Sequence, residues 1–296
     1  MSAQALLLHF DDEAALAARI GEAAGRPVAP ILRHRFPDGE LRLRLPPSLP
    51  PQVVVLRSLH APNEKLVELM LSAETARNLG ASRVALVAPY LAYMRQDVAF
   101  TPGEAVSQRI VGRFLGREFD ALLTFDPHLH RVASLAEVVP ATRALALSGA
   151  PLLADLIAAR RPGAILVGPD AESEQWVAAA AARHDLEFAV CTKVRHGDRE
   201  VSIRLPDQAF RGRATVLLDD MASTGRTAAR AARLLLEAGA ASVDVAVTHA
   251  LFVGDALDVM HRAGVGEVWS TDCIAHPTNA VGIAQTIATA LRGLLD

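Results

Sequence analysis

Aromatic residues are scarce in this chain: they make up 4% of its 296 residues, although hydrophobic residues as a whole make up 51%. The interior must therefore be filled mainly by Ala, Val, Leu and Ile, a composition that suits layered α/β structure. Cysteine is scarcer still, and the two cysteines, Cys191 and Cys273, form no CxxC pair. This excludes a disulfide framework and predicts a reducing, cytoplasmic environment.

An excess of positive charge is also missing, because 30 Lys and Arg residues face 33 Asp and Glu residues and the net charge is −3. A broad nucleic-acid footprint is therefore not expected, although local cations and a metal could still hold a polyanionic substrate. No uncharged run is long enough to cross a bilayer. The first residues have no basic region, and Asp11, Asp12 and Glu13 interrupt the apolar pattern, so neither a signal peptide nor a membrane partner is expected.

What the chain does contain is a regular alternation of short apolar runs and longer helical patterns rich in Ala, Leu and Arg. A length of 296 residues suggests two domains, each able to bury a core. Repeated strand-then-helix order favours parallel sheets covered on both faces, and two segments outside this rhythm, Leu41–Leu45 and Val201–Leu205, predict β ribbons. Strands are expected at Ala5–Phe10, Val53–Leu59, Val84–Ala88, Ala121–Phe125, Ala164–Val167, Ala214–Leu218 and Val243–Thr248, and helices at Glu13–Ala24, Glu64–Leu79, Gly103–Phe119, Pro151–Arg160, Glu172–Arg183, Thr227–Ala238, Ala256–Ala263 and Val281–Leu294.

The two halves share a pattern in which an apolar strand leads through a loop into a helix that ends in Gly-Ala before a further strand. Gly80 and Gly239 hold the same place in this pattern and differ by 159 positions, while Leu59 and Met221 differ by 162. A duplicated domain explains the agreement, although helix-Gly-Ala-strand is common in α/β folds. We expect a boundary near Leu145–Gly149, an N-terminal domain of 1–145, a C-terminal domain of 146–296, and an active site between them.

The most informative segment is Ala214–Thr227, in which an apolar strand ends in two carboxylates and a turn of small residues then opens a helix. Backbone N–H groups at a helix N-terminus can cradle a phosphate. Carboxylates at the carboxyl end of a strand lie where open α/β sheets bind ligands. A helix cap alone needs one such residue, not two Asp followed by Ser-Thr-Gly-x-Thr. This loop is similar to the phosphoribosyl-pyrophosphate signature of type I phosphoribosyltransferase folds, and its expected ligand contacts are Asp219, Asp220, Ser223, Thr224, Gly225 and Thr227.

Further blocks extend over nearly the whole chain: Phe36–Glu40, Pro62–Leu66, Pro89–Tyr90 with Tyr93–Asp97, Asp126–His128, Gly168–Asp170, Lys193–Arg195, the Asp219–Thr227 loop, and Thr271–Asp272. Together and in this order they resemble the ribose-phosphate pyrophosphokinase family, most of all its archaeal-type branch. The resemblance implies two similar type I phosphoribosyltransferase-like α/β domains, with ATP on the N-terminal side and ribose 5-phosphate on the C-terminal side. It also implies Mg²⁺ as cofactor and phosphoribosyl pyrophosphate and AMP as products.

For the ATP side, the resemblance implies a hairpin carrying Phe36, Asp38 and Glu40 that reaches the ATP site of a neighbouring subunit. The expected assembly is therefore a homo-oligomer. Adenine and the phosphates would be held by a second set of residues, Arg95, Gln96 and Asp97.

For the transferred group, the resemblance implies that His128 and Asp170 hold magnesium directly or through water, and that Lys193 and Arg195 are cations beside the reacting phosphate. Lys offers a point charge and Arg a planar fork for phosphate oxygens. In a strand, Lys193-x-Arg195 would place both on one face.

Other interpretations of these residues stay open. Lys193-x-Arg195 alone usually marks a solvated strand face, and Asp126-x-His128-x-His130 could form a soft-metal pair, although no third ligand is evident. The family usually follows its Pro-Asp with a Gly-rich turn, whereas Asp170 is followed here by Ala171–Trp176. Two further functions compete with the synthetase: a phosphoribosyltransferase, which would not need the Arg95–Asp97 block, and a catalytically weak regulatory paralogue, which the altered turn favours.

Overall fold

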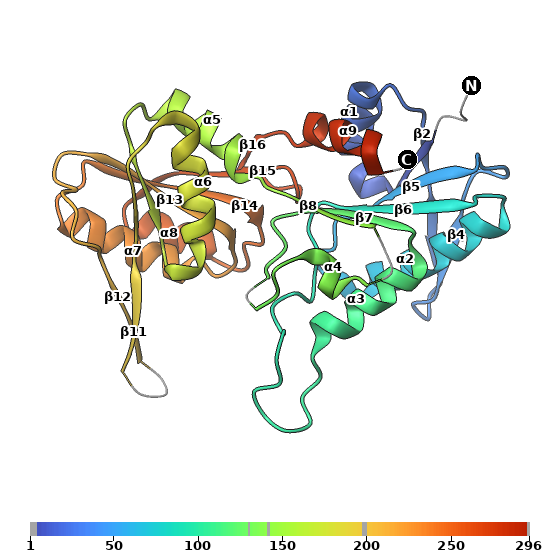
Figure 1. Cartoon of the computed structure of the whole chain (residues 1–296), viewed down its shortest axis with the longest axis horizontal. Helices are drawn as coiled ribbons and strands as arrows, with labels where there is room; N and C mark the ends of the chain where they lie inside the picture. Colours follow the sequence, from blue (N-terminus) through green and yellow to red (C-terminus); the bar gives the residue numbers. More distant parts are fainter. Residues whose placement is uncertain (1–4, 130, 141–142, 197–199, 295–296) are drawn as a thin grey trace. The chain divides into compact units, whose positions relative to one another are not determined.

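The computed structural model describes residues 5–129, 131–140, 143–196 and 200–294, and for 193–196 and 200–202 it describes the backbone alone. The chain divides into two compact units, one formed by Met1–Leu147 with Ile283–Asp296 and the other by Ser148–Gly282. Each unit holds a six-stranded sheet with helices on both faces (Figure 1). All strand pairs in the two sheets are parallel, which confirms the predicted fold class.

The sheet of the first unit is apolar on both faces, as a covered parallel sheet requires: Val53, Val54 and Val55 are all completely buried. Helices α2 (Pro62–Asn78) and α3 (Ser107–Glu118) lie over one face, and α1 (Ala14–Ala24) and α9 (Ala284–Leu294) pack together over the other (Figure 1). The strand order is β2 (Val28–Pro30), β1 (Leu6–His9), β5 (Gln52–Leu56), β6 (Arg83–Ala88), β7 (Ala121–Phe125) and β8 (Arg143–Leu147), with the short helix α4 (Leu135–Val138) before β8.

The second unit repeats this arrangement. Alternate residues of its central strand point to opposite layers, since Val216 and Leu218 pack with α5 (Ala150–Arg160) and α6 (Glu174–His184), while Leu217 packs with the layer of α7 (Arg226–Glu237) and α8 (Ala256–Arg262). The strand order is β10 (Phe188–Val190), β9 (Ile165–Gly168), β13 (Ala214–Ala222), β14 (Ser242–Ala250), β15 (Val265–Thr271) and β16 (Asn279–Val281).

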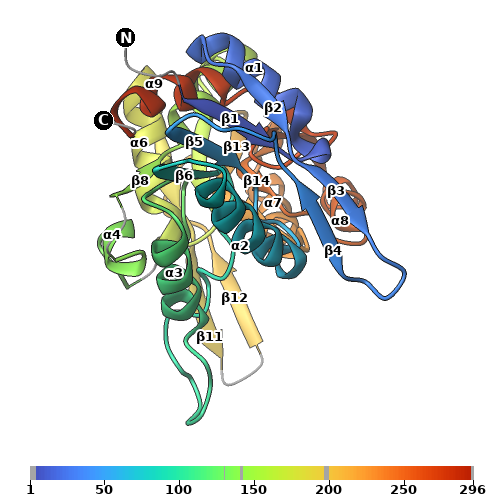
Figure 2. The same cartoon turned by 90° about the vertical axis from the view of Figure 1, so that its right-hand side faces the viewer.

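Each unit also has an antiparallel hairpin that follows the edge strand of its sheet. The first is β3 (Leu32–Arg35) with β4 (Leu41–Arg44), and the second is β11 (Thr192–His196) with β12 (Glu200–Arg204). Their registers are identical: Leu32 pairs with Arg44 and Thr192 with Arg204, so each position of the second hairpin carries a number 160 higher. Both ribbons extend away from their sheets (Figure 2).

The agreement between the units supports the duplication inferred from the sequence. Gly80 and Gly239 close α2 and α7 in the same way, with φ of 103° and 91°, a conformation that favours glycine. The predicted strands and helices are present, most of them with shifted ends. The main shift is at α3, which begins at Ser107 because the expected start, Gly103, lies in a turn with φ of 93°. Among the described residues, no helix combines the length and apolar character needed to span a membrane.

Candidate active site

Three carboxylates crowd the carboxyl ends of two neighbouring strands in the second unit. Asp170 follows β9, and Asp219 and Asp220 lie in β13, which pairs with β9. Asp220 is 2% exposed and Asp219 is half-buried. Burial, and then the charges of Asp220 and Asp170, raise the pKa of Asp219 well above its usual 3.8. This edge of the sheet therefore favours a cation or a ligand rich in hydroxyl groups.

The predicted phosphate loop follows directly. Strand β13 continues to Ala222, further than its apolar run predicted, so both Asp residues belong to the strand and neither caps α7. Ser223 is half-buried, and its carbonyl oxygen accepts a hydrogen bond from the Val253 N–H at 3.1 Å, which braces the turn. Thr224 and Thr227 are exposed. Because the N-cap of α7 has no side-chain cap hydrogen bond, the first-turn N–H groups suit an anion.

Gly225 is the N-cap of α7 and has φ of 68°. The sequence predicted Gly225 as a ligand contact, for which the absence of a Cβ would let a ligand approach the backbone. The structure gives a different reason, because a Cβ would lie 2.7 Å from the carbonyl oxygen of Ala256 and 3.1 Å from Cγ of Met260. Glycine is thus required by the backbone conformation and by the packing of α7 against α8.

The turn after Asp170, which is not Gly-rich as it usually is in the family, is held by the Asp170 side chain. Asp170 Oδ1 accepts hydrogen bonds from the N–H groups of Glu172 at 3.0 Å and Ser173 at 3.3 Å. Residues Ala171–Ser173 form a 3₁₀ turn that leads into α6. One oxygen of Asp170 therefore orders the helix start, and the carboxylate is held in a fixed place beside Asp219.

Lys193 and Arg195 lie in β11. Because they are two residues apart in a strand, their positions are on the same face, as predicted. Their side chains are outside what the structure describes. Ile203, which is paired with Lys193 in the register, is buried in the core of the second unit.

The predicted hairpin block of the first unit forms the tip of β3–β4, and Phe36, Asp38 and Glu40 are all exposed. The Phe36 ring stacks edge-on with His34, with ring centroids 4.9 Å apart, and the Arg42 guanidinium lies 5.9 Å from its centroid. In both views this hairpin lies well away from the long loop between β6 and α3 (Figures 1 and 2). The structure therefore does not join the hairpin block to the Arg95–Asp97 block of the same unit.

That loop holds Arg95, Gln96 and Asp97 after β6. Asp97 is paired with Arg131, whose Nη1 lies 2.7 Å from Oδ1 and 2.9 Å from Oδ2. Gln96 donates to the carbonyl oxygen of Val98 at 3.0 Å, and Arg95 is exposed. The sequence did not suggest Arg131, because it lies in a different loop from its partner.

The segment after the adjacent strand β7 carries the predicted metal neighbour, His128, which is half-buried. Asp126 just before it is 5% exposed and has a positive φ of 31°. His130 lies outside the described residues. Within the described part of the chain, no three His, Cys, Asp or Glu side chains are grouped so that they could hold a metal.

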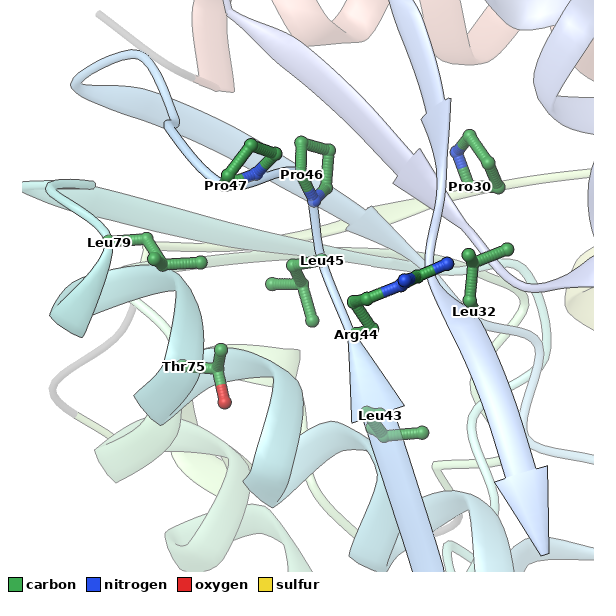
Figure 3. A pocket seen from close by; sticks show the side chains of 9 residues that line it. All are labelled: Pro30, Leu32, Leu43, Arg44, Leu45, Pro46, Pro47, Thr75 and Leu79. Atoms are coloured by element: carbon green, nitrogen blue, oxygen red, sulfur yellow. The ribbon is translucent and has the colours of Figure 1, made fainter.

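The first unit also has a groove of about 680 Å³ at the base of the β3–β4 hairpin (Figure 3). Its polar side chains are those of Arg44 and Thr75, and the rest of the lining is apolar. It therefore lacks the several donors that a triphosphate needs. The lining residues are Pro30, Leu32, Leu43, Arg44, Leu45, Pro46, Pro47, Thr75 and Leu79.

Comparisons with known proteins agree with this arrangement. Residues 5–117 match the family model described as the N-terminal domain of ribose phosphate pyrophosphokinase, and residues 141–284 match the phosphoribosyl transferase domain model. Ribose-phosphate pyrophosphokinase of Methanopyrus kandleri is 35% identical over 293 residues, covering 98% of this chain and 99% of that protein. The chain belongs to the ribose-phosphate pyrophosphokinase family. The predicted resemblance is thus confirmed.

A second relative supports the family, and a solved structure supports the fold. Ribose-phosphate pyrophosphokinase of Halobacterium salinarum is 32% identical over 289 residues, covering 97% of this chain and 100% of that protein. The crystal structure of phosphoribosylpyrophosphate synthetase from Mycobacterium smegmatis has a TM-score of 0.83 and 24% identity, covering 98% of both chains, and shows the same fold. The N-terminal match disfavours a simple phosphoribosyltransferase.

A charged network at the carboxyl ends of β1 and β5 was not predicted from the sequence. Arg57 is 1% exposed; its Nε lies 2.7 Å from Glu68 and its Nη1 2.7 Å from Asp12. Glu13 Oε1 accepts from the Ser58 N–H at 2.5 Å. Burial raises the pKa of Glu13 to about 7. A charged residue directly after an apolar run was the available signal, since Arg57 follows the run that ends at Leu56 as Asp219 follows the run that ends at Leu218.

Proposed function

We propose that this chain transfers the diphosphoryl group of ATP to the anomeric hydroxyl of ribose 5-phosphate. The observation that carries the proposal is the pair Asp219 and Asp220 at the end of β13, directly before the turn that opens α7 without a side-chain cap. A ligand with both hydroxyl groups and a phosphate, such as ribose 5-phosphate, uses both parts of this site. Family membership supports the same reaction. In this proposal the N-terminal domain, predicted at 1–145, holds ATP, the C-terminal domain, predicted at 146–296, holds ribose 5-phosphate, and the enzyme acts in the cytoplasm.

The residues divide the work of the reaction. Ser223, Thr224, Gly225 and Thr227 hold the 5-phosphate, and Asp219 and Asp220 accept hydrogen bonds from ribose hydroxyls. The anomeric oxygen forms a bond to the β-phosphorus of ATP and loses its proton, while the bond from that phosphorus to the α,β-bridging oxygen breaks and AMP leaves. Positioning and charge neutralisation supply most of the catalysis in such transfers.

The remaining predicted residues serve ATP and the charge that develops on it. Arg95, Gln96 and Asp97 hold adenine and phosphates, and the pairing of Asp97 with Arg131 fixes that loop. Lys193 and Arg195 neutralise charge on the transferred group and on the departing oxygen.

Mg²⁺ fits the acidic edge by its donor chemistry. Carboxylate oxygens are the protein ligands that Mg²⁺ prefers, and it is usually held by one or two of them together with substrate phosphates. Asp170 is fixed beside Asp219, whose raised pKa reports negative charge that a divalent cation would offset. His128, a nitrogen donor, suits contact through water. When bound, Mg²⁺ neutralises phosphate charge during transfer.

The crowding of these carboxylates predicts that Asp219→Asn stabilises the protein in the absence of ligands and metal. A carboxyl whose folded pKa is raised disfavours folding as pH rises above its unfolded pKa, because the unfolded state gives up its proton more easily. The variant should therefore have a higher melting temperature than the wild type at pH 8, and each 1 kcal/mol gained would correspond to about 2–4 °C in a chain of this size. The gain should vanish near pH 4.

Thermal unfolding with a metal chelator at both pH values checks this prediction. Magnesium should raise the melting temperature of the wild type more than that of the variant. Asp155→Asn is the control, because Arg183 lowers the pKa of that exposed carboxyl instead. A variant that is less stable than wild type at pH 8 would show that the three charges are compensated in the folded state.

An assay of AMP release from ATP tests the proposed reaction directly. AMP should form only when ribose 5-phosphate and Mg²⁺ are both present, in equal amount to phosphoribosyl pyrophosphate. If a folded sample makes no AMP but activates a second, active synthetase, the regulatory interpretation replaces this one.

We further propose that the active form contains more than one copy of the chain, because the β3–β4 tip is exposed and distant from the Arg95–Asp97 loop of its own unit. Light scattering should give a mass above that of one 31.5 kDa chain. Subunits with Phe36→Ala/Asp38→Ala can be mixed in equal amounts with subunits carrying Lys193→Ala/Arg195→Ala. After reassociation, about a quarter of the wild-type activity should return. The reason is that an isologous or ring interface combines hairpins and sites at random, and about a quarter of the combinations have both parts intact. An active monomer, or no restoration from reassociated mixtures, would contradict a shared site.

A further inference from the structure

The two hairpins place cations at matching positions. With the register shift of 160, Arg33 and Arg35 of β3 occupy the positions that Lys193 and Arg195 occupy in β11. The entry into each hairpin also matches, since the Ile31 N–H donates to the His9 carbonyl at 2.7 Å and the Cys191 N–H to the Gly168 carbonyl at 2.8 Å. The first unit therefore contains a counterpart of the cationic arm of the second.

The helices that follow β5 and β13 match at their C-terminal ends and differ at their starts. From Gly80 and Gly239 backward, buried Ser72, Ala73 and Ala76 of α2 correspond to buried Ala231, Ala232 and Leu235 of α7. Helix α2 has 17 residues and α7 has 12, so the extra residues of α2 fill the place of the phosphate loop. On this numbering Glu64 and Glu68 stand where the second unit has Ser223 and Thr227.

These two carboxylates pair with the two hairpin cations. Arg33 Nη1 lies 2.6 Å from Oε1 of Glu68, which is completely buried and also pairs with Arg57 at 2.6 Å. Arg35 pairs with Glu64, one helical turn earlier on α2. The four charges line a cavity of about 370 Å³ together with Asp12 and Lys65. Glu64 and Glu68 thus contact the hairpin of the first unit at the place where, in the proposed function, a phosphorylated ligand would lie beside the hairpin of the second unit.

We infer that Glu64 and Glu68 hold the β3–β4 hairpin permanently through Arg35 and Arg33, and that these two arginines are positioning residues for the hairpin tip. The inference rests on the proposed function, in which the tip completes the ATP site of a second copy. Arg33 and Arg35 are on the inner face with Leu41 and Leu43, while His34 and Arg42 are on the outer face, where both contact Phe36. Anchoring the inner face leaves the outer face presented in one orientation.

For the exposed pair of Arg35 and Glu64, the proposal predicts a change in ATP recognition with little change in stability. The Arg35–Glu64 pair is partly exposed, with side chains 55% and 37% accessible, and such pairs add little to folding. Loosening the hairpin misplaces its tip, and misplacement of a positioned group is costly. Arg35→Met, Glu64→Ala and Arg33→Met should each raise KM for ATP by about three- to tenfold, and leave kcat and KM for ribose 5-phosphate within about twofold.

The experiment compares these variants with a charge exchange, Arg35→Glu combined with Glu64→Arg, and with Glu74→Ala, which removes an exposed carboxylate from the same helix. The exchange should bring KM for ATP back to within about twofold of wild type, because it restores the pair. Glu74→Ala should leave every constant unchanged. Amide hydrogen exchange should be faster at Phe36–Glu40 in the single variants and slow again in the exchanged protein.

Phe36→Ala separates failure of this inference from failure of the proposed function. If Phe36→Ala raises KM for ATP while the anchor variants do not, the tip matters and the anchoring role is wrong. If Phe36→Ala has no effect in an enzyme that releases AMP, the tip is not part of the ATP site and the inference falls with that part of the proposal. If wild type releases no AMP, unchanged amide exchange in Arg35→Met still overturns the anchor. The anchoring role would also be overturned if the single variants had the same KM for ATP and the same amide exchange as the charge-exchanged protein.

Discussion

Replacing Lys193 or Arg195 by Ala should lower kcat by about 10²–10³-fold, the usual cost of removing one donor that stabilises transition-state charge. The change in KM for either substrate should be much smaller, because the charge that these cations meet grows during transfer and is weaker in the bound ground state. Both positions lie on one face of β11, so the double variant should cost less than the product of the two single effects.

Steady-state kinetics and single-turnover release of AMP measure this effect at the chemical step. Arg204→Ala is the matched control, since Arg204 is an exposed cation on the same hairpin and pairs with Thr192, on the opposite face. Its kinetics should resemble those of the wild type. Unchanged turnover in both Lys193→Ala and Arg195→Ala would remove the catalytic role from this hairpin.

The sheets and the turn between β13 and α7 could be predicted from the sequence because their signals are local. A buried parallel strand is a continuous apolar run, and Ala121–Phe125 was predicted with its observed ends. Asp219 and Asp220 stood out because charge at the end of such a run has no packing use. Strand β15 was missed because Gly264 and Gly266 interrupt its apolar pattern, and glycine usually marks a turn or a bulge.

The charged network of the first unit could not be predicted, since its pairs are distant in sequence. Arg57 meets Asp12 and Glu68, and Asp97 meets Arg131, only after the sheet has placed their loops together. The packing of α9 against α1 could not be predicted either, because the two helices lie at opposite ends of the sequence and no local pattern links them. Tertiary partners of charged side chains follow from strand order, which the apolar pattern does not specify.

The duplication explains how one architecture can hold two different sites. Strands β5 and β13 hold the same third place in the two sheets. Towards its carboxyl end β13 has Asp219 and is followed by an open turn, whereas β5 is followed by Arg57 and by the longer helix α2. Helix α2 is longer than α7, and its additional first residues bring the carboxylates that pair with the hairpin arginines. The same fold can thereby hold the proposed ribose 5-phosphate site in one unit and the proposed anchored hairpin in the other.

Combining Asp219→Asn with Asp220→Asn should abolish measurable binding of ribose 5-phosphate and leave the fold and ATP binding intact. A carboxylate accepts hydrogen bonds from hydroxyl groups, and a charged acceptor makes the stronger bond. Asn keeps the shape but replaces one acceptor by a donor. Helix capping cannot account for the pair, because both residues lie within β13 and the N-cap of α7 is Gly225.

The fold should survive this double substitution because it removes crowded negative charge: Asp220 and Asp170 already raise the pKa of Asp219 in the folded protein. Calorimetric titration with ribose 5-phosphate, and separately with a non-hydrolysable ATP analogue, distinguishes the two sites. Asp258→Asn, on α8 of the same unit, is the control and should bind both ligands as wild type does. Affinity for ribose 5-phosphate equal to that of the wild type would mean that the sugar hydroxyls are held elsewhere. The turn between β13 and α7 would then be a phosphate site without a ribose site.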